Sequence, residues 1–106
     1  MPKYLFAGSY TQAGLSGLIK DGGAKRRAAV EQLVAGLGGQ LEAFYFSLGK
    51  DDFLIIADLP SNVEAATASL LVSATGAIQG HLTVLMTPAE IDAAAQGTIN
   101  YRPPGQ

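Results

Sequence analysis

The segment from Gln40 to Leu59 most constrains the fold of this chain. It contains two runs rich in β-forming residues, Gln40 to Leu48 and Phe53 to Leu59, separated by Gly49-Lys50-Asp51-Asp52. Gly and Asp tolerate the positive φ that tight turns require, and Pro60 ends the second run because proline cannot donate to a strand ladder. The segment therefore predicts an antiparallel β-hairpin.

Helical patterns flank this hairpin on both sides. From Ala24 to Leu37 the apolar residues recur at helical spacing, and the pattern stops at Gly38-Gly39. After the hairpin, Ser61-Asn62-Val63-Glu64 has the capping-box pattern of a helix start. We expect a second helix from there to about Ala74, ended by Gly76.

Two further strands are expected outside these helices, from Lys3 to Tyr10 and from Ala77 to Met86. The resulting order is β, α, β, β, α, β, with a hairpin between the second and third strands. This is the order of the ferredoxin-like α+β sandwich, in which two helices cover one face of an antiparallel sheet. We therefore expect a single domain of this kind over residues 1–96.

The remaining segments are connections and a C-terminal extension. Four glycines between Thr11 and Gly23 predict an irregular connection, because glycine disfavours a regular helix. Thr87-Pro88-Ala89-Glu90 repeats the capping box with proline in the first turn, so a short third helix is expected from about Pro88 to Gln96. The tail from Gly97 to Gln106 ends in Pro103-Pro104-Gly105-Gln106 and is expected to be extended.

Hydrophobic patterning predicts self-association. Only 15% of the 106 residues are charged, below the usual 25% or so, and 48% are hydrophobic. Leu54 and Ile56 are expected on one face of the sheet and Phe53 and Ile55 on the other, so both faces carry apolar residues. The second helix is apolar nearly all round as well. A homodimer or higher oligomer would cover these surfaces; alternatively, the third helix and tail fold back over the open face of the sheet.

Composition disfavours several classes of function. The net charge of −2 offers no basic surface for nucleic acid or anionic lipid. No segment approaches the roughly 20 apolar residues of a membrane span, and the first ten residues resemble a strand rather than a signal peptide, so we expect a cytoplasmic protein. Without cysteine and with a single histidine, we expect no metal site and no cofactor.

Six polar residues are the candidates for ligand binding: Tyr10, Thr11, Arg26, Asp52, Asp58 and His81. Arg26 is near the start of the first helix, where backbone donors and the helix dipole favour anions. It has Lys20, Lys25 and Arg27 nearby, although the glycines before it lack the lysine and hydroxyl of a phosphate loop. A solvated basic helix face is the alternative interpretation of this cluster.

The other candidates also have structural interpretations. Asp58 is expected among apolar neighbours and needs a partner such as an arginine or tyrosine; an interface ion pair is favoured over a general base with a raised pKa. His81 could ligate haem or act as a base, although a structural or surface role is favoured. Asp51 and Asp52 are expected to cap backbone donors in their turn.

Several of these features together resemble the GYD-domain family of small bacterial and archaeal proteins. The shared features are Tyr10-Thr11, Gly14, the basic helix start around Arg26, Gly38-Gly39, the turn from Gly49 to Asp52, Asp58-Leu59-Pro60, Gly76 and the Leu-Met-Thr-Pro-Ala-Glu run. The resemblance covers residues 1–95 and implies a ferredoxin-like, oligomerising fold without an established activity. In the family's naming motif a tyrosine precedes the aspartate, whereas here Asp51 holds that position; Gly49 and Asp52 match.

Three functions are compatible with these features. The favoured one is a non-enzymatic oligomer that binds a small apolar or carboxylate-bearing molecule at an inter-subunit or sheet–helix cleft. The second is a cofactor-independent isomerase or oxygenase-like enzyme of the dimeric α+β barrel type, with Asp58 or His81 as base and a tyrosine as acid. The third is a structural or regulatory protein-interaction module. Because no catalytic dyad or triad emerges at a recognisable spacing, we favour a binding protein over an enzyme.

Overall fold

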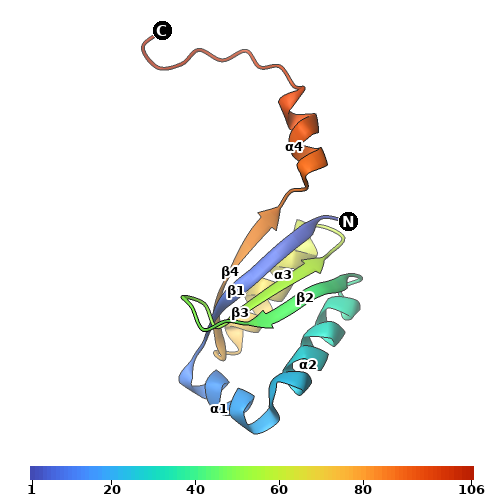
Figure 1. Cartoon of the computed structure of the whole chain (residues 1–106), viewed down its shortest axis with the longest axis vertical. Helices are drawn as coiled ribbons and strands as arrows, with labels where there is room; N and C mark the ends of the chain where they lie inside the picture. The colour runs from blue at the N-terminus through green and yellow to red at the C-terminus, as the bar shows by residue number, and fades with distance from the viewer.

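Four strands form an open antiparallel sheet in the computed structural model, which describes residues 1–106 (Figure 1). The strands are β1 (Lys3–Tyr10), β2 (Gln40–Phe46), β3 (Phe53–Asp58) and β4 (Ile78–Leu85). Their spatial order is β2-β3-β1-β4, and each neighbouring pair is antiparallel. This arrangement confirms the predicted ferredoxin-like α+β fold.

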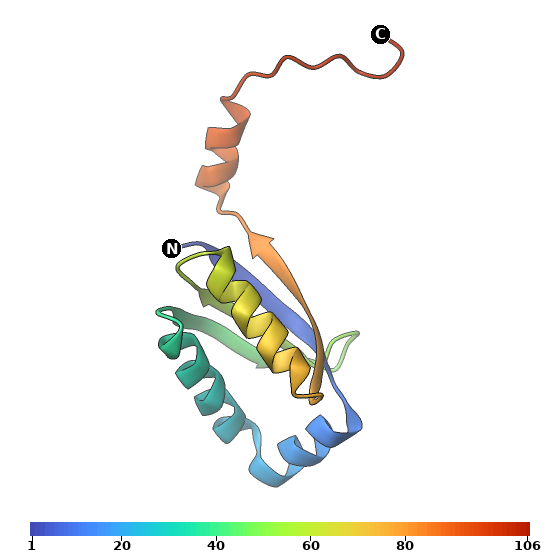
Figure 2. The same cartoon turned by 180° about the vertical axis from the view of Figure 1, so that it is seen from behind.

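Four helices accompany the sheet: α1 (Gln12–Asp21), α2 (Gly23–Gly36), α3 (Asn62–Ala74) and α4 (Pro88–Ala95). Helices α2 and α3 lie side by side on one face of the sheet (Figure 2). Helix α4 and the residues after it instead run away from the body, so the longest dimension of the molecule is 58 Å (Figure 1). None of the four helices combines the length and apolar character needed to cross a membrane.

The prediction of an irregular connection between β1 and α2 was wrong, because helix α1 occupies most of it. The Thr11 hydroxyl accepts a hydrogen bond from the Gly14 N–H at 3.3 Å and so caps the first turn. Gly14 is required by packing, since a Cβ there would lie 2.1 Å from the Ala77 carbonyl oxygen. The helix ends at Gly22, whose φ of +83° suits glycine. Tertiary contact therefore explains one of the glycines that argued against a helix.

The hydrophobic core lies between the sheet and helices α2 and α3. Its buried members include Val30 and Val34 from α2, Phe44 and Ile55 from the sheet, and Leu59 after β3. The adjacent Tyr4 is fully buried, and its hydroxyl donates to the Asn62 side chain at 2.7 Å. Because α2, α3 and the sheet share this core, its packing fixes the positions of the two helices on the sheet.

The hairpin between β2 and β3 differs from the prediction in two respects. Strict alternation along the run from Gln40 predicts Leu41 on the same face as Ala43 and Tyr45. A β-bulge between Leu41 and Ala43 shifts the register, so Leu41 instead packs against the core with Phe44. The connecting loop, Ser47–Asp52, also contains no residue with positive φ. Six residues are long enough to reverse the chain without the left-handed conformations of a two-residue turn.

We call the sheet face opposite α2 and α3 the open face. Strand register places the following side chains on it: Leu5, Ala7, Ala43, Tyr45, Leu54, Ile56, His81, Thr83 and Leu85. Tyr45 is 69% exposed and Leu54 38% exposed, so apolar surface remains there. The alternative interpretation, in which α4 and the tail fold back over this face, is contradicted, because both extend away from the body (Figure 1).

Candidate functional site

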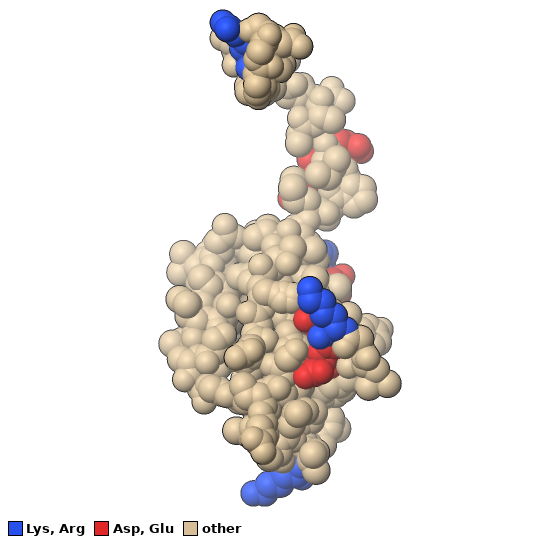
Figure 3. Space-filling model, turned by 90° about the vertical axis from the view of Figure 1, so that its left-hand side faces the viewer, with Lys and Arg blue, Asp and Glu red and all other residues tan.

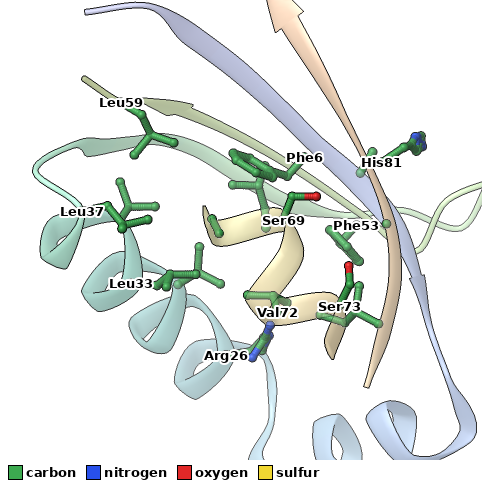
Figure 4. Close-up of a pocket in the computed structure, with 17 residues that line it drawn as sticks. Phe6, Arg26, Leu33, Leu37, Phe53, Leu59, Ser69, Val72, Ser73 and His81 are labelled. Atoms are coloured by element: carbon green, nitrogen blue, oxygen red, sulfur yellow. The ribbon is translucent and has the colours of Figure 1, made fainter. Parts of the chain in front are cut away.

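An apolar cavity opens between α2, α3 and the helix-covered face of the sheet, and we call it the slot (Figure 4). Of its 17 lining residues, 12 are hydrophobic. Val30 and Leu33 line it from α2, Phe6 and Phe53 from the sheet, and Val72 from α3. Such walls suit the apolar part of a small molecule.

Four polar residues line the slot, and one of them, His81, directs its imidazole away from it (Figure 4). Arg26, in the first turn of α2, reaches toward Val72 of α3 (Figure 4). Its Nε is buried and has no hydrogen-bond partner in the protein. Ser69 and Ser73 come from α3, four residues apart and therefore on one face of that helix. The slot thus combines apolar walls with one cationic donor and two hydroxyls.

Tyr10 and Asp52 lie beside Arg26, at the end of the slot nearest the start of α2. The Tyr10 ring centroid is 5.3 Å from that of Phe53, which lines the slot. Burial raises the pKa of the Tyr10 hydroxyl, while the nearby Arg26 guanidinium opposes that rise. The Asp52 carboxylate accepts a hydrogen bond from the Tyr10 backbone N–H at 3.0 Å. The structure therefore brings together three of the six predicted site residues.

Arg26 also borders a second hollow, beneath α1. Tyr10, Gly14, Leu18 and Ile78 line this hollow with it. Arg26 and Ile78 belong to the walls of both cavities. The Arg26 side chain is therefore accessible from both the slot and the hollow beneath α1.

Thr11 has a structural role next to this group. Besides capping α1, its hydroxyl donates to the Gly76 carbonyl oxygen at 2.7 Å, and its backbone N–H donates to the Ala77 carbonyl oxygen at 2.9 Å. These bonds fasten the start of α1 to the segment before β4. The hydroxyl thus donates one hydrogen bond and accepts another within the fold. Thr11 therefore positions Tyr10 by holding the adjoining backbone.

Asp58 lies on the open face, away from the slot. Its predicted partner was an arginine or tyrosine, but the structure pairs it with Lys3 of the same chain at 2.9 Å. Lys3 also pairs with Glu42 at 3.2 Å, and the hydrogen bonds to Asp58 and Glu42 raise the pKa of Lys3. Asp58 is therefore neutralised by a lysine of its own chain rather than by an arginine or tyrosine.

His81 is on the open face as well. Its imidazole points away from the slot, on the far side of β4 (Figure 4), and its side chain is 57% exposed. Its Nε2 lies 3.4 Å from the Asp51 carboxylate. No group of three or more His, Asp or Glu side chains is close enough together to hold a metal ion. His81 and Asp58 are thus separated by the sheet from Tyr10 and Arg26.

The sequence interpretation missed Ser69 and Ser73, because α3 was treated as uniformly apolar. Two serines at a spacing of four in the apolar second half of the helix were the available signal, since this spacing places both on one face. The inward orientation of that face could be known only from the packing of α3 on the sheet.

The family model of the GYD domain matches residues 4–95. The chain belongs to the GYD-domain family. The match confirms the resemblance seen in the sequence, and it extends from β1 through α4, leaving out the last residues of the chain. Neither the curated proteins nor the solved structures contain a match to this GYD-domain chain. In the loop between β2 and β3, the Asp52 carboxylate accepts a hydrogen bond from the Tyr10 backbone N–H. Asp51, which replaces the tyrosine of the family's naming motif, contacts His81.

Proposed function

We propose that this GYD-domain protein is a homo-oligomer whose subunits each bind a small, largely apolar carboxylate in the slot. The observation that carries the proposal is the buried, unpartnered Nε of Arg26 at one end of an apolar cavity. A buried donor without an acceptor costs roughly 1–3 kcal/mol. An anionic group on the ligand would supply that acceptor, and a carboxylate matches the planar fork of a guanidinium.

The apolar walls define the rest of the ligand. Burial of apolar surface against Phe6, Leu33 and Phe53 contributes about 25 cal/mol for each Å² removed from water. Ser69 and Ser73 add hydroxyls that can bond a polar substituent along the α3 side. An aromatic or short aliphatic monocarboxylic acid fits both parts of this description.

The arrangement supports binding more than catalysis. The two bases considered for an enzyme, Asp58 and His81, point into the open face, and Asp58 is engaged by Lys3. A general base must come within about 3 Å of the proton it removes, directly or through one water molecule. Asp58 does not line the slot and the His81 imidazole points away from it (Figure 4), so the isomerase or oxygenase-like alternative has less support.

The open face supports the oligomeric part of the proposal. Tyr45 and Leu54 leave apolar surface in the middle of a sheet that is otherwise covered on only one side. The Lys3 to Asp58 ion pair lies near one end of the same face and leaves its centre uncharged. Two such faces can pack together, because antiparallel sheets pack readily at about 10 Å separation.

A matched pair of probes tests ligand binding. Phenylacetate and its neutral analogue phenylacetamide have the same apolar part, so the difference between their dissociation constants isolates the charge. We expect phenylacetate to bind at least tenfold more tightly to the natural protein, by calorimetry or NMR titration, since a charged hydrogen bond contributes about 1.5–3 kcal/mol.

Two arginine variants provide the control. Arg26→Met should abolish the preference for the acid, whereas Arg27→Met should retain it, because Arg27 is exposed and pairs with Glu31 at 2.9 Å. Equal affinity of the natural protein for the acid and the amide would overturn the role of Arg26. Loss of the preference in both variants would have the same consequence.

A further inference from the structure

Helix α4 and the chain around it have almost no contact with their own subunit. We call the segment from Met86 to Gln106 the arm. Every residue from Pro88 to the C-terminus is exposed, including Ile91 at 53%, Ile99 at 85% and Tyr101 at 65%. Figures 1 and 2 show from opposite sides that the arm projects beyond the end of β4. Its apolar side chains therefore lack a partner within the subunit.

The start of the arm directs it away from the body. Thr87 is extended, with φ −74° and ψ 159°, and the following Pro88 disfavours the α conformation at Thr87. The capping box adds a bond from the Thr87 N–H to the Glu90 carboxylate at 2.9 Å and one from the Glu90 N–H to the Thr87 hydroxyl at 3.1 Å. These constraints hold α4 pointing outward, where it can meet another molecule.

The outer face of α3 carries a complementary surface. Val63, Leu70 and Leu71 are 72%, 70% and 65% exposed, and their spacing of seven and eight residues places them in one stripe along the helix. We call this the α3 stripe. It spans roughly 12 Å, which is also about the length of the eight-residue α4. Figure 2 shows α3 on the outside of the molecule, with no element covering it.

The matching lengths and apolar character of α4 and the α3 stripe point to a second copy of this chain as the occupant. The two surfaces lie apart within one chain, because the arm projects beyond β4 while α3 packs on the sheet (Figures 1 and 2). Glu64 is in the first turn of α3 and Glu90 in the first turn of α4, so an antiparallel pairing keeps these two carboxylates apart. The GYD-domain match includes α4, so this helix belongs to the matched domain rather than to the tail after it.

We infer that the arm of one copy docks on the α3 stripe of another, with α4 antiparallel to α3 and Ile91 packed against Leu70 and Leu71. The contact uses a surface distinct from both the slot and the open face. It therefore stands independently of the proposed ligand and of sheet-to-sheet packing. Reciprocal exchange of arms closes a dimer, whereas exchange with successive neighbours builds a larger assembly.

The absence of cysteine allows a direct test by disulfide trapping. Full-length Leu70→Cys and Ile91→Cys chains carrying different tags are co-expressed, purified through both tags and oxidised. We expect a disulfide-linked heterodimer on a non-reducing gel. The matched control replaces Leu70→Cys by Leu48→Cys, a still more exposed position in the loop after β2, and should give at least fivefold less product. All three positions are exposed, so the variants should fold.

Three outcomes would overturn the inference. One is no more product from the Leu70 pair than from the Leu48 control. Another is preferential linkage of Ile91→Cys to a Leu54→Cys chain, which would place the arm on the open face. The third is an intramolecular disulfide in monomers of the Leu70→Cys, Ile91→Cys double variant without linkage between chains, which would show that the arm folds back.

Discussion

The carboxylate of Asp52 accepts a hydrogen bond from the backbone N–H of Tyr10, 3.0 Å away. This contact joins the loop before β3 to the last residue of β1, two places that are 42 residues apart in the chain. The Asp52 backbone N–H also donates to the Gly8 carbonyl oxygen at 2.7 Å. Asp52 thus fixes the strand end that holds Tyr10 beside Arg26, and its role is structural.

Replacement of Asp52 should therefore destabilise the fold. Asp52→Ala leaves a part-buried N–H without its charged acceptor, and we expect the free energy of unfolding to fall by about 1–3 kcal/mol in urea denaturation. Asp51→Ala is the control: it removes only a 3.4 Å contact with an exposed histidine and should cost less than about 0.5 kcal/mol. Similar losses in the two variants would contradict this assignment.

Two glycines of α1 should respond in opposite ways to alanine. Gly17→Ala adds a Cβ into open space and should stabilise the protein by about 0.5–1 kcal/mol, because glycine is disfavoured inside helices. Gly14→Ala places a Cβ 2.1 Å from the Ala77 carbonyl oxygen and should destabilise it by about 1–3 kcal/mol. Thermal unfolding of both variants is the measurement. Stabilisation by Gly14→Ala would show that α1 is not held against this segment.

A charge on the open face should reduce the molecular mass in solution. Leu54→Glu places a carboxylate in the middle of the apolar sheet surface, and burial of an unpaired charge at an interface is strongly unfavourable. Light scattering should show a smaller species than for the natural protein. Leu48→Glu, in the exposed loop, should leave the mass unchanged. An unchanged mass for Leu54→Glu would argue against packing through this face.

Acid should loosen the start of α4. Hydrogen bonds from the Thr87 backbone and hydroxyl groups lower the pKa of Glu90 below its ordinary value of 4.5. Since the pKa is lower in the folded state, the capping contact stabilises α4 fully above about pH 4.5 and is lost as the pH falls through the lowered value. Carbon NMR of the Glu90 carboxyl, followed with the α4 amide signals, measures both events.

The control for this titration is Glu90→Gln, which keeps an oxygen acceptor but has no proton to gain. Its Thr87 and Ala89 amide signals, which lie in the capping turn, should remain constant through the same pH range. If they shift in acid as they do in the natural protein, another group is responsible for the response.

Regular periodicity made most of the fold predictable. Strands and helices with alternating or helical apolar patterns, such as β3 and α2, lie within a few residues of their expected limits. Features that depend on contact between distant segments were missed. Helix α1 was not predicted because its segment contains several glycines, and the proximity of Ala77 explains one of them, Gly14. The bulge that turns Leu41 toward the core has no local sequence pattern.

Only part of the candidate site was predicted, because its composition depends on contact between distant segments. Tyr10, Arg26 and Asp52 were chosen by residue type, and the structure gathers them at one end of the slot. Asp58 and His81 were chosen in the same way but lie across the sheet. Residue type indicates which chemistry a side chain can perform, whereas strand register decides which face it occupies.

The sequence by itself determined every element except α1, the order of those elements and the excess of apolar surface, because these follow from local periodicity and composition. Tertiary structure decided which apolar surfaces enclose a cavity, which polar atom is left there without a partner, and where the arm points. These properties depend on distances between residues far apart in the chain. Packing of α2 and α3 on the sheet sets those distances, and no local pattern encodes them.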